Sequence, residues 1–292
     1  MKYLIIGGTG LVGQHVARQL RDKNADLTIL SRNPESKKVL SGVKTIKGDL
    51  QSPKVIRRIF NGIDAVFMAN TVSPTECQEG LMAINGAMEA NVDRFVYLSV
   101  HHVDEAPYIP HFGSKLGIEE ALKSSQMSYA IIRANNFYQN DEWYRDGLMQ
   151  KNTYTQPIGS IGLSRVDVRD VAEASAILLT WEASFKRIIS LVGPEVLSGE
   201  RTAQIWSRVF GRMISYVQEP MAKWEQKARK MIPDWMAYDF RVMYEFFQEE
   251  GLKATHKEIK ELERLLGHSP RSYHDYVKEA AKQWTKMAAS AS

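Results

Sequence analysis

The sequence has little cysteine, no strong net charge and no long hydrophobic run. Its one cysteine, Cys77, excludes an intramolecular disulfide and fits a reducing compartment. The net charge of +4 is too small and too scattered to indicate nucleic-acid binding, which needs a clustered basic face. The apolar run near the N-terminus, Tyr3–Ile6, is far too short for a signal peptide or a membrane span. We therefore expect a cytoplasmic protein that binds neither membrane nor nucleic acid.

An alternation of two periodicities is present in the first half of the chain. Short β-branched or apolar runs predict strands at Tyr3–Ile6, Leu27–Leu30, Val43–Ile46, Ala65–Met68, Phe95–Leu98 and Tyr129–Ile132. Helical spacing between these runs predicts helices at Leu11–Leu20, Pro53–Phe60, Glu79–Ala90 and Lys115–Leu122. Strands that alternate with helices indicate βαβ units and a parallel sheet. Nearly continuous apolar strands are typical of a sheet that is covered on both faces.

The second half of the chain is more helical. Helices are predicted at Asp167–Thr180 and Ser198–Phe210, with a strand at Ile188–Val192 between them. Gly211 ends the second of these helices, as a C′ glycine would. From Met221 onward the chain is mostly helical in pattern. We therefore predict an α/β fold in which a doubly wound parallel sheet carries a smaller, mostly helical C-terminal lobe.

The predicted division places the doubly wound domain at residues 1–155, with a strand and a helix contributed by about 164–193, and the lobe at 194–292. We expect this lobe to form the substrate side of the site. Aromatic residues crowd it and suit a flat, conjugated substrate, although most aromatic side chains in any fold belong to the core. The mixed faces of Met221–Met231 and Asp234–Gln248 leave a homodimer open.

The segment Gly7–Gly13 follows the first predicted strand and opens the first helix. Its glycines permit a tight turn, a close approach of backbone to pyrophosphate, and close packing of helix on strand. The helix N-terminus offers free N–H groups and a positive dipole end to phosphate oxygens. The strand and helix on either side weaken the alternative of a turn that binds no ligand. The pattern predicts a Rossmann-type dinucleotide site at Gly7, Thr9, Gly10, Leu11, Val12 and Gly13.

The end of the second predicted strand indicates which dinucleotide is favoured. A site for NAD usually has Asp or Glu there to hold the ribose hydroxyls, but this chain has Ser31 and Arg32. Arg32 offers a planar fork for a 2′-phosphate and Ser31 offers a hydroxyl, while Lys37 and Lys38 add positive potential. We therefore predict NADP(H) in preference to NAD(H). The alternative is a solvated basic turn.

Residues that follow strands at the carboxyl edge of a doubly wound sheet line its cofactor crevice. By this rule the site also includes Asp49, Leu50, Ala69, Asn70, Asn135, Asn136 and Phe137. Asp49 is expected to accept from the adenine amino group or to cap the next turn. Ala69 and Asn70 should lie beside the nicotinamide ribose. The last three should line the nicotinamide side, and the alternative is a turn with asparagine in the left-handed αL conformation.

His101 and His102 follow the fifth predicted strand. Two neighbouring histidines suggest a metal, but no third ligand stands at a convincing spacing. Successive residues on a strand also face opposite ways. We therefore expect residues at the pocket rim or on the surface, and no bound metal.

Eight segments together resemble the NmrA-like group of atypical short-chain dehydrogenases/reductases. They are GGTGLVG at Gly7–Gly13, SRNP at Ser31–Pro34, GDL at Gly48–Leu50, YLSV at Tyr97–Val100, PHFGSK at Pro110–Lys115, IIRANNFYQN at Ile131–Asn140, VDVRDVAEA at Val166–Ala174 and LVGPEVLSGE at Leu191–Glu200. The resemblance covers nearly the whole chain, more weakly beyond Gly211. It implies NADP(H) binding. The group holds reductases of quinones, dyes or plant phenolics, and also redox-sensing regulators without demonstrated chemistry.

The resemblance therefore implies an NADPH-dependent reductase of a conjugated or carbonyl small molecule. The alternative is a non-catalytic NADP(H) sensor that acts through a protein partner. In the parent superfamily a Tyr-x-x-x-Lys pair and a serine form the active site. Here Lys115 matches the lysine that holds the nicotinamide ribose, Ser99 matches the serine, and His111 stands in the tyrosine position. Three hypotheses remain open: His111 donates the proton, water supplies it, or the site only binds cofactor.

Overall fold

The computed structural model describes residues 1–36 and 38–291, which form two compact units. The first unit comprises Met1–Ala134, Val168–Leu191 and Arg264–Gly267, and the second comprises the rest of the described chain. Each unit is described separately below.

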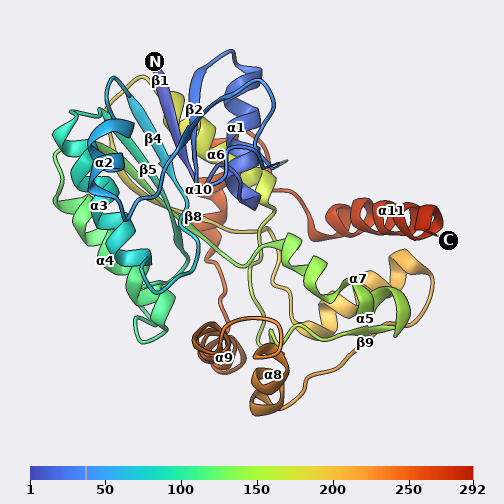
Figure 1. Ribbon diagram of the computed structural model, residues 1–292. Helices are drawn as coiled ribbons and strands as arrows, with labels where there is room; N and C mark the ends of the chain where they lie inside the picture. Colours follow the sequence, from blue (N-terminus) through green and yellow to red (C-terminus); the bar gives the residue numbers. More distant parts are fainter. Residues whose placement is uncertain (37, 292) are drawn as a thin grey trace. The chain divides into compact units, whose positions relative to one another are not determined.

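Seven parallel strands form the sheet of the first unit, in the order β3-β2-β1-β4-β5-β6-β8 (Figure 1). The strands are β1 (Lys2–Ile6), β2 (Asp26–Ser31), β3 (Lys44–Lys47), β4 (Ala65–Met68), β5 (Arg94–Val100), β6 (Ser128–Ala134) and β8 (Lys186–Leu191). The direction of strand addition reverses between β1 and β4, which makes the sheet doubly wound. This confirms the predicted fold class.

Helices cover both faces of this sheet because their apolar residues recur at helical spacing. On one face α1 (Leu11–Asp22) packs against α6 (Val168–Thr180). The buried residues of α1, which include Val16 and Leu20, form one stripe, and polar residues occupy the opposite side of the helix. The other face carries α2 (Pro53–Ile59), α3 (Glu76–Glu89) and α4 (Pro110–Ser124) (Figure 1).

Two helices begin earlier than the apolar spacing predicts. α3 begins at Glu76 rather than Glu79, and α4 begins at Pro110 rather than Lys115. Proline suits the first helical position, because the N–H that it lacks would have no partner inside the helix. Because the helices start earlier, Glu76 and His111 lie in the first helical turns, at the carboxyl edge of the sheet. The candidate functional site described below lies at this edge.

The second unit contains short strands and most of the C-terminal helices. Its elements are η1 (Tyr138–Tyr144), α5 (Arg145–Gln150), β7 (Thr153–Tyr154), α7 (Gly199–Phe210), β9 (Ser215–Tyr216), α8 (Met221–Ala228), α9 (Asp234–Glu249) and α11 (Tyr273–Ala291). α10 (His256–Leu266) crosses the division between the units. α7 has the predicted ends: the Ser198 hydroxyl accepts from the Arg201 N–H, and Gly211 has a left-handed φ of 64°.

The segment 135–167 belongs to the second unit, whereas the predicted boundary lies at residue 155. The reason is that residues of this segment form backbone pairs with residues that come much later in the sequence. Leu163 bridges to Leu197 and to Leu252, and the Ser164 N–H donates to the Leu252 carbonyl. Nothing local in the sequence indicates these bridges.

A buried charge network holds the second unit together. Arg165 and Asp141 are both fully buried and form an ion pair at 2.8 Å. The Tyr154 hydroxyl donates to Asp141 at 2.9 Å, and the Tyr273 hydroxyl donates to the same carboxylate. Burial raises the pKa of both tyrosines well above the ordinary value, so both hydroxyls keep their protons and remain donors.

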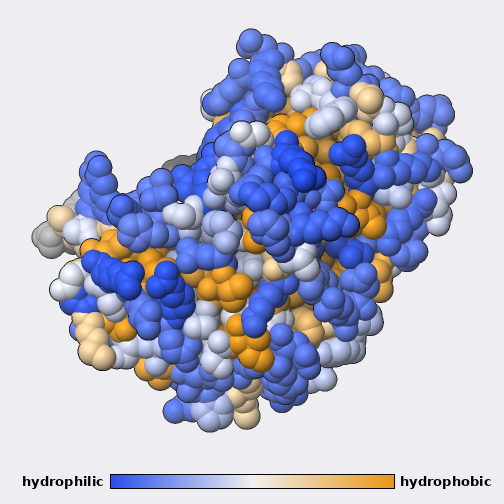
Figure 2. All heavy atoms as spheres, turned by 180° about the vertical axis from the view of Figure 1, so that it is seen from behind, coloured by the Kyte–Doolittle hydropathy of each residue, from blue (hydrophilic) through white to orange (hydrophobic). Residues whose placement is uncertain are grey.

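In the described part of the chain, every helix is either too short or too polar for a membrane-spanning segment. On the face seen in Figure 2, hydrophilic side chains predominate and hydrophobic ones appear between them in several patches. The most exposed large hydrophobic side chains are Met213 and Met231. A homodimer stays a prediction.

Arg165→Met tests the buried network. This change leaves the Asp141 carboxylate buried without its positive partner, so the free energy of unfolding should fall by about 3–5 kcal/mol. Urea denaturation followed by tryptophan fluorescence measures the loss, because Trp206 donates to Tyr273 in this network. The control Arg201→Met removes a half-buried pair with Glu195, whose charged atoms are 3.7 Å apart, and should cost less than about 1 kcal/mol. Equal losses in the two variants would contradict the assignment.

Candidate functional site

The turn after β1 needs glycine at two positions. Gly7 has a φ of +83°, and its carbonyl accepts from the Gly10 N–H at 2.9 Å. A Cβ on Gly7 would lie 2.2 Å from the Ala69 carbonyl oxygen. A Cβ on Gly13 would lie 2.2 Å from the Gly7 carbonyl oxygen. α1 therefore packs against the turn more closely than any larger residue allows, as the glycine spacing predicts.

The N-terminus of α1 is free to bind an anion. Gly10 occupies the N-cap position with an extended backbone, no side chain of the described residues caps the helix, and its first turn has no acidic residue. The first N–H groups of a helix lack partners within the helix, and the dipole is positive there. These are the properties of a phosphate-binding helix terminus. Leu11 is exposed at this end, whereas Val12 is buried beneath it.

A pocket opens beside this turn, at the switch point between β1 and β4. It is lined by Ile6, Gly7, Thr9, Leu30, Ser31, Arg32, Gly48, Asp49, Leu50, Ala69, Asn70, Thr71, Ser73 and Glu79. The predicted residues that it brings together are Gly7, Thr9, Ser31, Arg32, Asp49, Leu50, Ala69 and Asn70. Strand ends carry most of the lining, which the crevice rule predicts. Glu79 was missed because it enters from within α3, where no local signal marks it.

Arg32 is the free cation of this pocket. It is exposed, and its guanidinium has neither an ion pair nor a hydrogen bond with any residue that the structure describes. The preceding Ser31 is buried, and its hydroxyl accepts from the Asn33 N–H at 3.1 Å, which shapes the turn. Lys38 is exposed, and Lys37 lies outside the described residues. An unpaired guanidinium at the pocket edge is suited to a phosphate.

Two further pocket residues differ in their polar contacts. Asp49 Oδ1 accepts from the Gln51 N–H at 2.9 Å, so the turn-capping role that the sequence left open is present. Its contact with adenine stays a prediction. The amide nitrogen and oxygen of Asn70 are both buried without a hydrogen-bond partner in the described part of the chain. Buried amides in native proteins seldom lack partners, which points to a polar ligand group beside Asn70.

The superfamily residues of the first unit lie at the ends of β5 and α4. His111 and Lys115 are one helical turn apart on α4, so they share a face, and both are buried. Lys115 Nζ donates to Glu76 Oε1 at 2.6 Å. Ser99 on β5 is buried, and its hydroxyl has no partner among the described residues. Sequence reasoning missed Glu76, because it lies 39 residues before Lys115.

Asn135, Asn136 and Phe137 belong to the second unit, where their polar groups are engaged. The Asn135 amide donates to the Leu252 carbonyl at 2.8 Å and accepts from the Asn136 N–H. Arg165 donates to Asn136 Oδ1 at 3.0 Å and to the Phe137 carbonyl at 2.8 Å. The alternative of a left-handed asparagine turn is wrong, because neither Asn135 nor Asn136 has a positive φ. A nicotinamide contact for the three residues stays a prediction.

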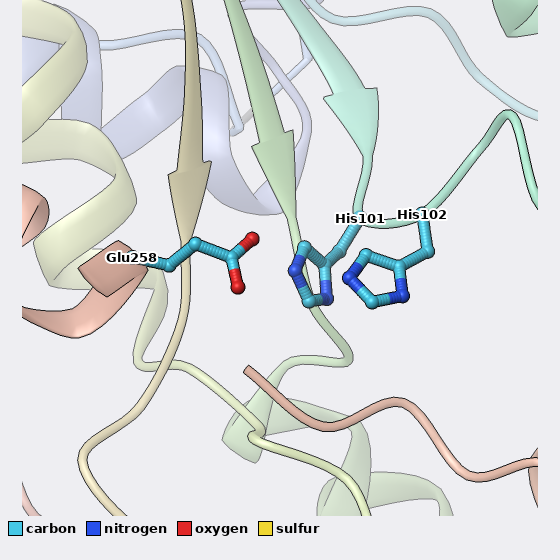
Figure 3. Close-up of side chains that lie close together, drawn as sticks. All are labelled: His101, His102 and Glu258. Carbon is cyan, nitrogen blue, oxygen red and sulfur yellow. The ribbon is translucent and has the colours of Figure 1, made fainter. Parts of the chain in front are cut away.

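His101 and His102 lie just beyond β5 with ring centroids 3.9 Å apart (Figure 3). The expectation that they face opposite ways is wrong, because His102 has a left-handed φ of 55° and the chain leaves the strand there. A surface position is also wrong for His101, which is fully buried. His102 Nδ1 lies 3.0 Å from a carboxylate oxygen of Glu105. Glu258, also drawn in Figure 3, comes from α10 in the second unit.

The doubly wound sheet and its glycine turn define a Rossmann-type dinucleotide-binding protein. More narrowly, the chain belongs to the NmrA-like family, whose profile matches residues 1–277.

Two of the relatives that match over nearly the full length of both chains are named reductases. An NAD(P)H azoreductase from Xenophilus azovorans is 26% identical over 283 residues, which is 95% of this chain and 97% of the relative. A (4-alkanoyl-5-oxo-2,5-dihydrofuran-3-yl)methyl phosphate reductase from Streptomyces griseus is 29% identical over 283 residues, or 96% and 98% of the two chains.

Solved structures share the fold at lower identity. An NADPH-dependent quinone oxidoreductase from Escherichia coli, complexed with NADPH, has a TM-score of 0.84 and 18% identity over 96% of this chain and 99% of that one. A triphenylmethane reductase from Citrobacter sp., complexed with NADP(H), has a TM-score of 0.83 and 20% identity over 96% of this chain and 100% of that one.

Proposed function

We propose that this protein is an NAD(P)H-dependent oxidoreductase that reduces a conjugated or carbonyl small molecule, such as a quinone or a dye. The observation that carries the proposal is the pocket at the β1–β4 switch point, next to the uncapped N-terminus of α1. Two relatives that match over nearly their full length, the azoreductase and the phosphate reductase, support the activity. The structural neighbour complexed with NADPH supports the cofactor class.

The residues present fit such a cofactor. The turn from Gly7 to Gly13 would hold the pyrophosphate, since the first N–H groups of α1 have no partner within the helix and the glycines allow a close approach of the backbone. Asp49 and Leu50 would border the adenine, and Lys115 would hold the nicotinamide ribose. A bound nicotinamide dinucleotide supplies a hydride to the acceptor.

The preference for NADP(H) over NAD(H) rests on Arg32. Its guanidinium has no partner in the described part of the chain, and β2 ends without the carboxylate that would hold ribose hydroxyls. A 2′-phosphate supplies the anionic partner that this arginine lacks. We also propose that the protein is cytoplasmic, because its single free cysteine, Cys77, fits a reducing compartment.

The proton is supplied by water when the acceptor is conjugated. Reduction of a quinone- or dye-like acceptor places charge on a delocalised system, which does not need a side-chain acid. His111 is buried on the same helical face as Lys115. Under this hypothesis His111 packs beside the site and transfers no proton.

A non-catalytic sensor is the alternative, and it would use the same pocket. It is not favoured, because the azoreductase and the phosphate reductase, which match over nearly their full length, are named reductases. Steady-state NADPH oxidation across quinones, azo dyes and aldehydes separates the two functions. We expect turnover with at least one quinone or dye. Tight NADPH binding with no turnover of any acceptor would instead support the sensor.

Arg32→Ala tests the cofactor preference. The loss of a charge-assisted contact with the 2′-phosphate should weaken NADPH binding by about 10- to 100-fold and leave NADH binding nearly unchanged. Calorimetric titration of both nucleotides gives the two dissociation constants. Arg57→Ala removes an exposed arginine from the far end of α2 and is the matched control for net charge. Equal weakening of NADPH and NADH by Arg32→Ala would refute the role.

His111→Phe tests the source of the proton. If water is the source, kcat with a quinone acceptor should stay within about threefold, well below the 100-fold or larger contribution of a general acid. Stopped-flow or steady-state NADPH oxidation provides the rate, and the thermal midpoint checks that the variant folds. A loss of about 100-fold in kcat in a folded variant would make His111 the acid.

A further inference from the structure

Glu76 is a buried acid that the proposed function does not yet use. It is the first residue of α3, fully buried, and follows the loop that leads from β4 and the pocket. A carboxylate is favoured at a helix N-terminus, but burial still demands a positively charged partner. That partner is Lys115, whose Nζ lies 2.6 Å from Glu76 Oε1.

Lys115 is held from two sides. Besides the bond to Glu76, its ammonium lies over the ring of Tyr97, 5.9 Å from the centroid. Among the residues that the structure describes, Glu76 is the only hydrogen-bond partner of this ammonium. An ammonium has three N–H donors, so two remain available for a ligand.

Other polar atoms of Glu76 and of strand β5 are buried and unpaired. Glu76 Oε2, the Tyr97 hydroxyl and the Ser99 hydroxyl are buried without hydrogen-bond partners in the described chain. Tyr97 and Ser99 are two residues apart on β5, so they face the same side of the sheet. Met68 lies opposite Tyr97 in the register, and Asn70 follows Met68 as Ser99 follows Tyr97. The unpaired amide of Asn70 therefore continues the same polar row into the pocket.

The row offers donors and acceptors together. Burial raises the pKa of Tyr97 well above its ordinary value, and the Glu76 carboxylate raises it further, so the hydroxyl stays protonated and can donate. Glu76 Oε2 can only accept, and the Asn70 amide can do both. A group that carries hydroxyls and an amide, such as a nicotinamide riboside, matches this mixture. A phosphate, which only accepts, does not.

We infer that Glu76 is a positioning residue of the cofactor site, which holds the Lys115 ammonium against Tyr97 for the nicotinamide-ribose half of the dinucleotide. This role rests on the proposed function. Glu76 touches Lys115 rather than the reacting atoms, so it acts through the lysine. The negative charge of Glu76 also balances the positive charge of Lys115. The groups that attract the cofactor phosphates are therefore the N-terminus of α1 and Arg32.

Two ligands separate positioning from mere stabilisation. NADPH contains the nicotinamide ribose, whereas adenosine 2′,5′-bisphosphate carries only the adenine half with its phosphates. Glu76→Gln should weaken NADPH binding by about 10-fold or more, the size of a lost contact with a charged donor, and change binding of the bisphosphate by less than about twofold. Calorimetric titration measures both. Glu89→Gln, the same change at the exposed end of α3, should alter neither.

A double variant keeps the test valid if Glu76→Gln folds poorly. Glu76→Gln combined with Lys115→Met replaces both buried charges with uncharged groups of similar shape, so the thermal midpoint should recover toward that of the unaltered protein. NADPH affinity should stay low, because the two free N–H donors are gone. The bisphosphate again serves as the reference ligand for the adenine half.

Several results would overturn the inference. They are unchanged NADPH binding in Glu76→Gln, an equal change in both ligands, and recovery of NADPH affinity together with stability in the double variant. An equal tightening of both ligands would show that Glu76 acts only by repelling phosphates. If neither ligand binds the unaltered protein, the proposed function itself fails, which is a separate outcome.

Discussion

The close approach of α1 to the turn after β1 is the constraint on which the rest of the site depends. With only 2.2 Å between a Cβ on Gly13 and the Gly7 carbonyl oxygen, any larger residue would push the helix away from the strand. The uncapped helix terminus would then no longer lie beside the ends of β2 and β4. Arg32, Asn70 and the helix amides can serve one ligand only because this contact holds them at one edge of the sheet.

Two clusters of buried polar groups differ in how fully their members are paired. In the second unit Arg165, Asp141 and their tyrosine partners satisfy one another, so they give that unit a specific core rather than a reactive centre. In the first unit Glu76 and Lys115 pair, yet the atoms around them remain unpaired. Paired networks stabilise a fold, whereas unpaired buried atoms indicate where a ligand completes it. This contrast supports the proposed cofactor site at the carboxyl edge of the sheet.

Much of the fold was predictable from the sequence, because its strands are apolar and its helices are amphipathic. The elements from β1 to β6 follow local periodicity, and α7 ends at Gly211 as predicted. The pocket residues at strand ends followed from topology alone. The boundary at 155 did not, because Leu163 pairs with residues that come much later in the chain. The orientation of the two histidines was also missed, since a positive φ at His102 has no clear local signal.

The glycine turn, the doubly wound topology and the basic residue after β2 could be deduced from the amino-acid sequence, because each depends on local steric or periodic requirements. Three features follow instead from the packing of distant residues: Lys115 pairs with Glu76, Arg32 has no partner in the described chain, and Arg165 donates to the amide oxygen of Asn136. These features depend on which side chains from distant parts of the sequence come into contact. The packing of whole helices and strands determines such contacts, and no local sequence pattern predicts them.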